Sequence, residues 1–243
     1  MTEKASEILE CLMAMGDEVQ ARQLQRFFKT APGQYGHGDK FIGLRVPQTK
    51  LDVKEAKVDV ELADAVALVH SEWHEARFAG FLLMTELYKK VRKRKDESAQ
   101  REIIDTYVSL IPRGNNWDLV DCVCPHLLGE WLVDHPDERK ILYELAASDN
   151  LWAKRVSLVT NWMLVRHNQF EDLKKLAVIH INHPHDLIHK ALGWMLREMG
   201  KRDETELTDF LDQYATQLHR TALRYSLEKL SADKKQYYMK LKS

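Results

Sequence analysis

Apolar residues recur at helical spacing along nearly the whole chain, and the strand-like alternation of apolar and polar residues is almost absent. Only 10 glycines and 6 prolines interrupt this pattern in 243 residues. Short helices joined by short connections favour an all-α protein in which helical hairpins stack side by side. The pattern predicts helices at 3–14, 17–30, 48–56, 59–69, 73–94, 97–110, 115–134, 137–147, 150–166, 170–180, 186–199, 203–217, 219–230 and 232–241.

Several of these helices have recognisable ends. The pairs Asn115-Asn116 and Asp149-Asn150 each stand directly before an apolar helical segment, where their side chains can accept hydrogen bonds from the first backbone N–H groups. Proline lies in three of the breaks, as its missing N–H predicts. Pro125, in contrast, falls inside the segment 115–134, so we expect a kink there.

Three tryptophans give a loose internal repeat. Trp117, Trp152 and Trp194 follow one another at intervals of 35 and 42 residues, each within an amphipathic segment. Repeats of about 40 to 47 residues are typical of HEAT-like helix pairs. No segment rich in Gly, Ser or Pro divides the chain, and we therefore expect a single domain over residues 1–243.

The composition excludes some classes of protein. No apolar run approaches the roughly 18 residues that span a bilayer, and the N-terminus has scattered charges in place of a signal peptide. The three cysteines form no disulfide framework, which fits a reducing compartment, and we expect a cytoplasmic protein. The net charge of −1 neither requires nor excludes nucleic acid, because a basic stripe can be balanced by acidic residues elsewhere.

One segment is irregular. Residues 29–47, KTAPGQYGHGDKFIGLRVP, hold four of the ten glycines. The segment is either a plain connection or a loop that approaches a ligand closely, since clustered glycines permit close backbone contact.

Trp117 and Asp121 are the first candidate site residues. Their spacing of four places both on one helical face. An aromatic plane beside a carboxylate suits a site that holds a flat or sugar-like group and stabilises positive charge. The alternative is a core tryptophan beside a solvated aspartate.

Two further segments combine tryptophan with basic residues. Trp152 and Arg155 are three residues apart, and Lys190, Trp194 and Arg197 share a helical face. Cations that hold phosphates and aromatic rings that meet sugars or bases are typical of nucleic-acid surfaces. Each pair would otherwise be a core ring with an ion-paired surface charge. In a solenoid, equivalent positions line one surface, and we expect these tryptophans to be exposed on it.

Metal and nucleotide chemistry are not indicated. Cys122 and Cys124 are two residues apart, and the histidines at 180, 183, 185 and 189 lack the partners of a zinc motif. The chain has no phosphate loop, no dinucleotide fingerprint and no nucleophile elbow. We expect neither a metal nor a cofactor.

The chain resembles a known family in five segments that occur in order: FFKTAPGQYGHGDKFIGLRVPQ, NNWDLVDCVCPHLLGEWL, SDNLWAKRVSLV, HKALGWMLREMGK and HRTALRYSLEKL. Together they are similar to the AlkD-type DNA alkylation repair glycosylases. The resemblance implies a right-handed superhelical solenoid of HEAT-like repeats that holds duplex DNA containing alkylated bases. It implies hydrolysis of the N-glycosidic bond of cationic purines such as 3-methyladenine and 7-methylguanine, without a cofactor or an obligate protein partner, by a monomer.

The resemblance also assigns roles. It implies that Asp121 is the catalytic carboxylate, that Trp117 and Trp194 flank the sugar of the damaged nucleotide, and that Arg155 binds the DNA backbone. The family often has a tyrosine at the position that Phe27 matches, so this chain keeps the aromatic surface and loses a hydroxyl.

Two alternatives stay open at this stage. Some relatives of the same fold lack the carboxylate and bind DNA without cutting it, and HEAT-like arrays often serve as protein-interaction scaffolds. The retained WDLVD segment favours the enzyme.

Overall fold

The computed structural model describes residues 1–56 and 59–241, and within these ranges the regular structure is helical apart from an isolated bridge between Lys40 and Trp73. The expected all-α class is therefore confirmed for the described residues. None of the helices in this part of the chain is long and apolar enough to cross a membrane. The chain divides into two compact units, residues 1–123 and 124–243. The single domain expected over 1–243, like its right-handed superhelical course, stays a prediction.

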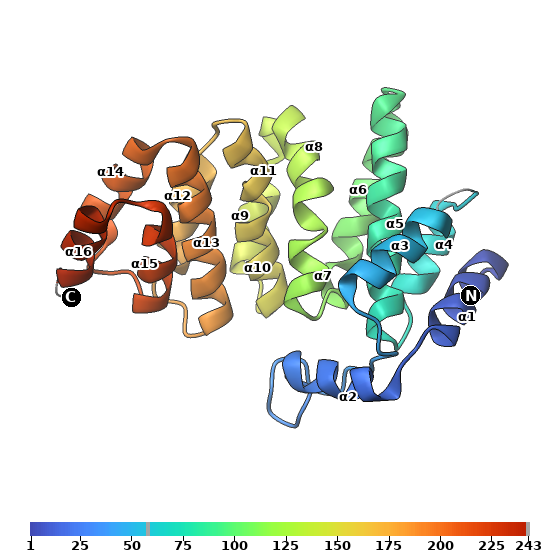
Figure 1. Ribbon diagram of the computed structural model, residues 1–243. Coiled ribbons are helices and arrows are strands. Elements are labelled where there is room, and N and C mark those ends of the chain that lie inside the picture. Colours follow the sequence, from blue (N-terminus) through green and yellow to red (C-terminus); the bar gives the residue numbers. More distant parts are fainter. Residues whose placement is uncertain (57–58, 242–243) are drawn as a thin grey trace. The chain divides into compact units, whose positions relative to one another are not determined.

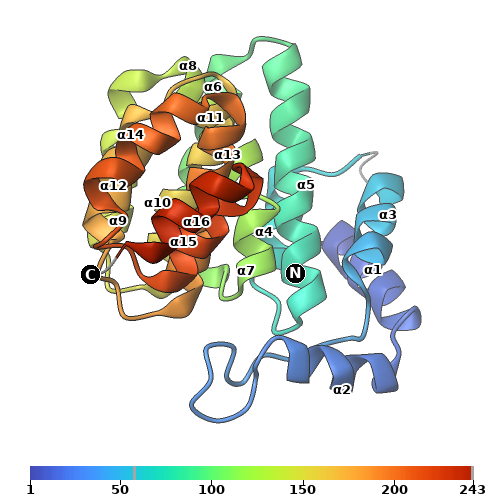
Figure 2. The same ribbon diagram turned by 60° about the vertical axis from the view of Figure 1, so that its left-hand side comes forward.

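The N-terminal unit is built around one long helix, α5 (His74–Lys93), which packs against α3, α4 and α6. Its buried side chains include Phe78, Phe81, Met84 and Tyr88. Figure 2 shows α5 with α4 and α3 at its side. The other elements of the unit are α1 (Glu3–Ala14), α2 (Glu18–Phe27), α3 (Val46–Ala56), α4 (Leu62–Val69), α6 (Glu97–Leu110), a 3₁₀ turn η1 (Ile111–Arg113) and α7 (Trp117–Asp121).

The C-terminal unit is a series of packed helix pairs, and α13 (Asp186–Arg202) contacts most of them (Figure 1). It packs against α10, α11, α12, α14 and α15. This pattern of neighbouring helical pairs agrees with the expected stack of hairpins. The other elements are η2 (Cys124–His126), α8 (Leu128–Asp134), η3 (Pro136–Glu138), α9 (Lys140–Ala147), α10 (Leu151–Val159), α11 (Asn161–Arg166), α12 (Glu171–His180), α14 (Glu204–Tyr214), α15 (Arg220–Ser226), η4 (Leu227–Lys229) and α16 (Ala232–Lys240).

The predicted helix over 115–134 is wrong as one element. The chain leaves the helix at Cys122, and Pro125 lies in the 3₁₀ turn η2 before α8 begins. The predicted helix over 150–166 is likewise divided, with α10 ending at Val159 and α11 beginning at Asn161. Apolar residues keep their helical spacing across both breaks, because the short helices on either side each bury an apolar face. The spacing of apolar residues alone therefore does not show where these helices end.

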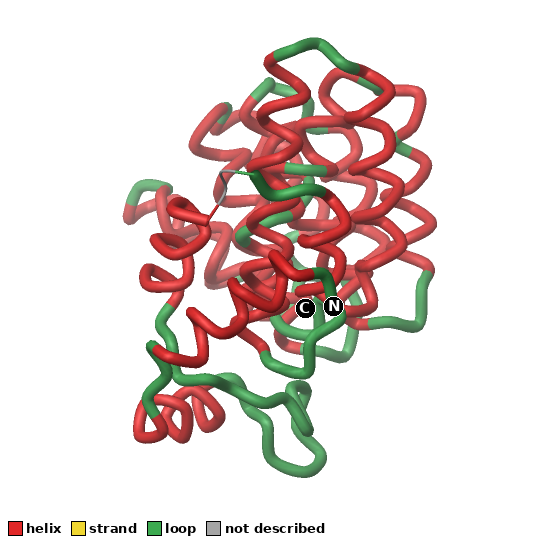
Figure 3. Tube along the Cα trace, turned by 90° about the vertical axis from the view of Figure 1, so that its right-hand side faces the viewer, coloured by secondary structure: helices red, strands yellow, loops and turns green. Residues whose placement is uncertain are grey.

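The segment between α2 and α3, residues 28–45, contains no helix and is drawn as a long loop in Figure 3. We call it the glycine segment. Its rings Phe28 and Phe41 are buried, while Phe27 at the end of α2 is exposed. The segment is therefore packed against the unit rather than being a free connection.

Candidate functional site

Helix α7 begins with a capped tryptophan. The Asn116 side chain is fully buried, and its Oδ1 accepts a hydrogen bond from the Trp117 backbone N–H at 2.9 Å. Its Nδ2 donates to the Phe28 carbonyl oxygen at 3.4 Å. The cap expected at Asn116 is thus confirmed, and it also ties the start of α7 to the glycine segment.

The Trp117 indole is half-buried in an aromatic cluster. Its ring stacks on Phe28 with centroids 5.2 Å apart, and it meets Phe27 edge-on at 5.8 Å. Phe27 is 61% exposed, so the cluster reaches from the core to the surface. The structure therefore brings together two residues that the sequence assigned to one site from widely separated segments.

A cavity of about 130 Å³ lies beside this cluster. Its walls are mainly aromatic and aliphatic, with buried polar groups of α5 and α7 among them. Leu24, Phe27, Phe28, Phe41, Leu44, Arg45, Val46, Thr49, His74, Glu75, Phe78, Trp117 and Asp118 line it.

Asp121 is the last residue of α7 and is half-buried. Its carboxylate acts on the neighbouring thiol, since burial together with the charges of Asp118 and Asp121 raises the pKa of Cys122 to about 11, despite the opposing charge of Lys50. Cys122 is therefore a neutral thiol at ordinary pH.

Beneath the aromatic cluster lies a buried ionic network. His74, the first residue of α5, has its Nδ1 2.9 Å from Asp39 Oδ2 and its Nε2 2.8 Å from Asp118 Oδ2. Arg77, one turn further along α5, donates to Asp39 and, at 2.9 Å, to Asn115 Oδ1. The network thus joins the glycine segment, α5 and the start of α7.

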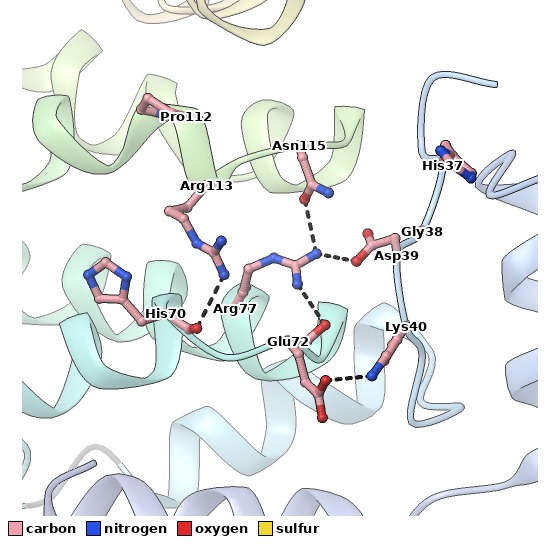
Figure 4. A pocket seen from close by; sticks show the side chains of 10 residues that line it. All are labelled: His37, Gly38, Asp39, Lys40, His70, Glu72, Arg77, Pro112, Arg113 and Asn115. Atoms are coloured by element: carbon pink, nitrogen blue, oxygen red, sulfur yellow. Dashed lines mark hydrogen bonds and ion pairs between the residues drawn. The ribbon is translucent and has the colours of Figure 1, made fainter. Parts of the chain in front are cut away.

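Figure 4 shows the open side of this network, a pocket of about 470 Å³. Arg77 points between Asp39 and Asn115, and Lys40 forms an ion pair with Glu72 at 2.6 Å. Arg113 also lines the pocket and donates to the backbone carbonyls of the last residue of α4 and of the two residues that follow it.

Glu75 anchors the glycine segment to α5. Its carboxylate accepts hydrogen bonds from three consecutive backbone N–H groups, those of Ile42, Gly43 and Leu44, at 2.8, 2.9 and 3.1 Å. Gly43 has φ of +103°, and a Cβ there would lie 2.0 Å from the Asp17 carbonyl oxygen. A glycine is required at this position for both reasons.

In the C-terminal unit, α13 carries three of the predicted residues. Trp194 is half-buried. Lys190 forms an ion pair with Asp186 at 2.8 Å, and Arg197 pairs with Glu228 of η4. The basic groups are therefore matched with acids in the free protein.

Trp152 and Arg155 are buried, so the exposure expected for Trp152 is wrong, while the roles of both residues in DNA binding stay predictions. Trp152 is 6% exposed and Arg155 is 5% exposed, and Arg155 donates to the Leu187 carbonyl oxygen in the first turn of α13. Helix α10 packs against α9, α12 and α13, so almost every face of it is covered. A spacing of three shows that two residues share a face, but it does not show which neighbour covers that face.

Comparison with known proteins bears on this arrangement. A family model described as DNA alkylation repair enzyme matches residues 8–230. The chain belongs to the DNA alkylation repair enzyme family. This membership assigns it a role in DNA alkylation repair, and it confirms the resemblance at the level of the family.

A solved structure from Enterococcus faecalis, described as a predicted DNA alkylation repair enzyme, shares the fold. It has 19% sequence identity and a TM-score of 0.70, and the match covers 89% of this chain and 97% of that one. At this identity the likeness concerns the fold alone. A search of curated protein sequences gave no significant match.

Sequence reasoning missed the buried ions of this family member. His74 and Asp39 are 35 residues apart, and His74 and Asp118 are 44 apart, so no local spacing links them. The one available signal was Asp118, which lies between the two residues selected from the WDLVD segment.

The clustered cysteines and histidines do not gather into a ligand set. None of the three cysteines forms a disulfide, and no three His, Cys, Asp or Glu side chains in the described ranges are grouped as metal ligands. Burial and neighbouring cations lower the pKa of His180 to about 4, so this histidine is neutral at ordinary pH.

Proposed function

We propose that this protein is a DNA glycosylase that hydrolyses the N-glycosidic bond of alkylated, cationic purines such as 3-methyladenine and 7-methylguanine in duplex DNA. The observation that carries the proposal is α7, which presents Trp117 in an aromatic cluster and Asp121 on the same short helix in a member of this repair family.

The chemistry follows from the charge of the lesion. A purine alkylated at N3 or N7 is cationic, so when its bond to C1′ breaks, the electron pair goes to the base, which leaves neutral. Positive charge then gathers on the deoxyribose. A carboxylate held near the sugar in a partly dry site stabilises this charge, and that is the role we assign to Asp121.

The reaction is completed by water. A water molecule adds to C1′ and loses a proton, which Asp121 can accept or pass to solvent. No general acid is needed, because the leaving base is neutral without protonation. The electron-rich face of the Trp117 indole adds attraction for the cationic sugar, worth roughly 0.5–2 kcal/mol.

DNA contacts form the second part of the proposal. Phe27 is exposed beside Trp117 and would meet the duplex through its ring. We further propose that Trp194 contacts the sugar of the same nucleotide, and that Lys190 and Arg197 bind phosphates after leaving their acidic partners. Arg155 would act from its buried position in α10, where it donates to a backbone carbonyl in the first turn of α13, and Trp152 would act from the same buried helix.

The decisive test is base release from methylated duplex DNA in the presence of a chelator. Asp121→Asn should slow single-turnover release at least ~100-fold while changing duplex affinity only a few-fold, because it removes transition-state charge stabilisation rather than a DNA contact. Asp105→Asn, an exposed carboxylate of the same unit, is the matched control and should release bases at the parental rate.

Other results of the base-release and DNA-binding measurements would contradict the proposal in different ways. Release by Asp121→Asn at the parental rate would remove Asp121 from the chemistry. Retention of DNA without release by any variant would identify a non-catalytic DNA-binding protein. Failure to retain duplex DNA at moderate salt would favour a protein scaffold.

A further inference from the structure

The buried imidazole of His74 lies between two carboxylates. The residue is 2% exposed, and each ring nitrogen is within 3 Å of a carboxylate oxygen, one from Asp39 and one from Asp118. A neutral imidazole can donate from one nitrogen only, so His74 donates to both carboxylates only in its imidazolium form. Burial alone would lower the pKa of His74, but the carboxylates of Asp118 and Asp39 outweigh it and raise the pKa to about 9.

Two aromatic rings cover this cation. Phe41 stacks on the His74 ring at 4.4 Å and Phe28 lies at 5.1 Å from it. Phe28 is also the ring on which Trp117 stacks. His74 is therefore connected to Trp117 through two neighbours. One is Phe28, whose ring contacts both residues, and the other is Asp118, which is next to Trp117 in α7.

The other charged side chains around His74, those of Arg77 and Glu75, anchor the glycine segment rather than α7. Arg77 binds Asp39, and Glu75 binds the amides of residues 42–44, so the glycine segment keeps two anchors on α5 without His74. Within the part of the chain that the structure describes, the Asp118 side chain has no second anchor outside α7: besides its contact with His74, it accepts a hydrogen bond from the backbone N–H of Leu119 in α7 itself. The particular contribution of His74 therefore falls on α7.

Helix α7 needs such a support. It spans five residues, Trp117–Asp121, which is far below the length at which a helix is stable without tertiary contacts. Two of the three residues proposed to act on the sugar, Trp117 and Asp121, lie in this short helix. A shift of about 1 Å in a reacting group is enough to lower a rate substantially.

We propose that His74 is a positioning residue of the repair site, whose buried cation holds Asp118 and the Phe28–Trp117 stack and thereby fixes Trp117 and Asp121 against the substrate. The assignment to catalysis rests on the proposed glycosylase function. The structural part, which is the control of α7 by His74, can be measured independently of activity.

The first experiment uses the full chain labelled with ¹⁵N in histidine and tryptophan side chains. In the parental protein at pH 7, both ring nitrogens of His74 should show the shifts of an imidazolium. His74→Gln should move the indole N–H resonance of Trp117, which is identified by its loss in Trp117→Phe. His180→Gln, at a buried histidine that is neutral, is the matched control and should leave that resonance in place.

The same variants are then assayed on methylated duplex. His74→Gln should lower the single-turnover release rate at least ~10-fold with duplex affinity changed less than ~3-fold, since a positioning defect acts on the reacting geometry. A neutral His74 at pH 7, an unmoved Trp117 resonance, or a parental release rate in His74→Gln would each overturn the proposal. If the parental protein releases no base, the proposed function fails, and the resonance measurements still decide the control of α7.

A second pair of variants guards against a His74→Gln protein that does not fold. Asp118→Asn and Asp39→Asn each remove one carboxylate from His74 and keep the side-chain shape. Asp118→Asn should shift the Trp117 resonance more and slow release more than Asp39→Asn, because only Asp118 lies on α7. An equal or reversed order would show that His74 has no particular connection to α7.

Discussion

His74 makes the stability of the N-terminal unit depend on pH. Its pKa in the folded protein is raised from 6.5 to about 9, so its contribution is fully present below about pH 6.5 and is lost as the pH rises through 9. The free energy of unfolding, measured by urea denaturation from pH 6 to 10, should fall by roughly 2–3 kcal/mol more in the parental protein than in His74→Gln. Parallel curves for the two proteins would show that His74 does not titrate in this way.

The two adjacent phenylalanines should behave differently when truncated. Phe28 is buried and stacked on both His74 and Trp117, so Phe28→Ala should cost about 3–5 kcal/mol of unfolding free energy. Phe27 is 61% exposed, and Phe27→Ala should cost less than about 1 kcal/mol while weakening duplex binding. Denaturation and fluorescence anisotropy on the same preparations test both. Unchanged duplex affinity in Phe27→Ala would exclude it from the DNA surface.

At the scale of residues, sequence reasoning succeeded where the determinants are local. The caps at Asn116 and Asn150 are confirmed, because a cap is set by its own residue and the next three. Trp117 and Phe27 do meet, although the resemblance rather than spacing selected Phe27. The burial of Trp152 was not predictable, because it depends on the helices that cover α10.

At the scale of helices, too, features set by local sequence were predicted and features set by distant residues were not. The helices at 3–14 and 97–110 end where the periodicity predicts, since an apolar stripe and polar flanks define them locally. The interruption at Pro125 was predicted as a kink and is a full break between two helices, whereas the break after Val159 was not predicted. The anchoring of the glycine segment by Glu75 was also out of reach, because an acceptor for three amides thirty residues away leaves no pattern in either segment.

The contact between α13 and α15 depends on a glycine. A Cβ on Gly193 would lie 2.5 Å from the Ala222 carbonyl oxygen and 2.6 Å from the Tyr225 Cβ, so these helices would have to move apart. Gly193→Ala should lower the free energy of unfolding by about 2 kcal/mol or more, despite the better helix propensity of alanine. It should also disturb the indole environment of its neighbour, Trp194.

Gly200→Ala, in the same helix, is the matched control. Its nearest obstacle is the Leu207 side chain, whose Cδ2 would lie at 2.4 Å, and no backbone atom is among its three nearest neighbours. Its cost should therefore be clearly smaller than that of Gly193→Ala in the same denaturation series. A larger cost for Gly200→Ala would mean that the helix pair is not limited by backbone contact.

At the scale of the whole molecule, charge balance shapes DNA binding. The chain carries 36 basic and 37 acidic residues, and the basic groups proposed for DNA contact are already paired with acids, Lys190 with Asp186 and Arg197 with Glu228. A phosphate must displace an acid at each contact. The net gain per contact is therefore small, and binding should owe more to shape and aromatic contact than it does in a strongly basic DNA-binding protein.

The competition between acids and phosphates for these basic groups can be tested by removing an acidic partner. Glu228→Gln removes one of the two acids paired with Arg197, the other being Glu198, and should tighten duplex binding a few-fold at low salt. Arg197→Ala should weaken binding and flatten the salt dependence of log K by up to about 0.9. Glu7→Gln, which frees Lys4 of α1 from a comparable surface pair, should change neither quantity. Affinities measured from 50 to 200 mM salt would separate the cases. If Glu228→Gln binds DNA no more tightly than the parental protein, Arg197 does not contact a phosphate. Removing an acid that competes for Arg197 would otherwise strengthen the interaction of Arg197 with that phosphate.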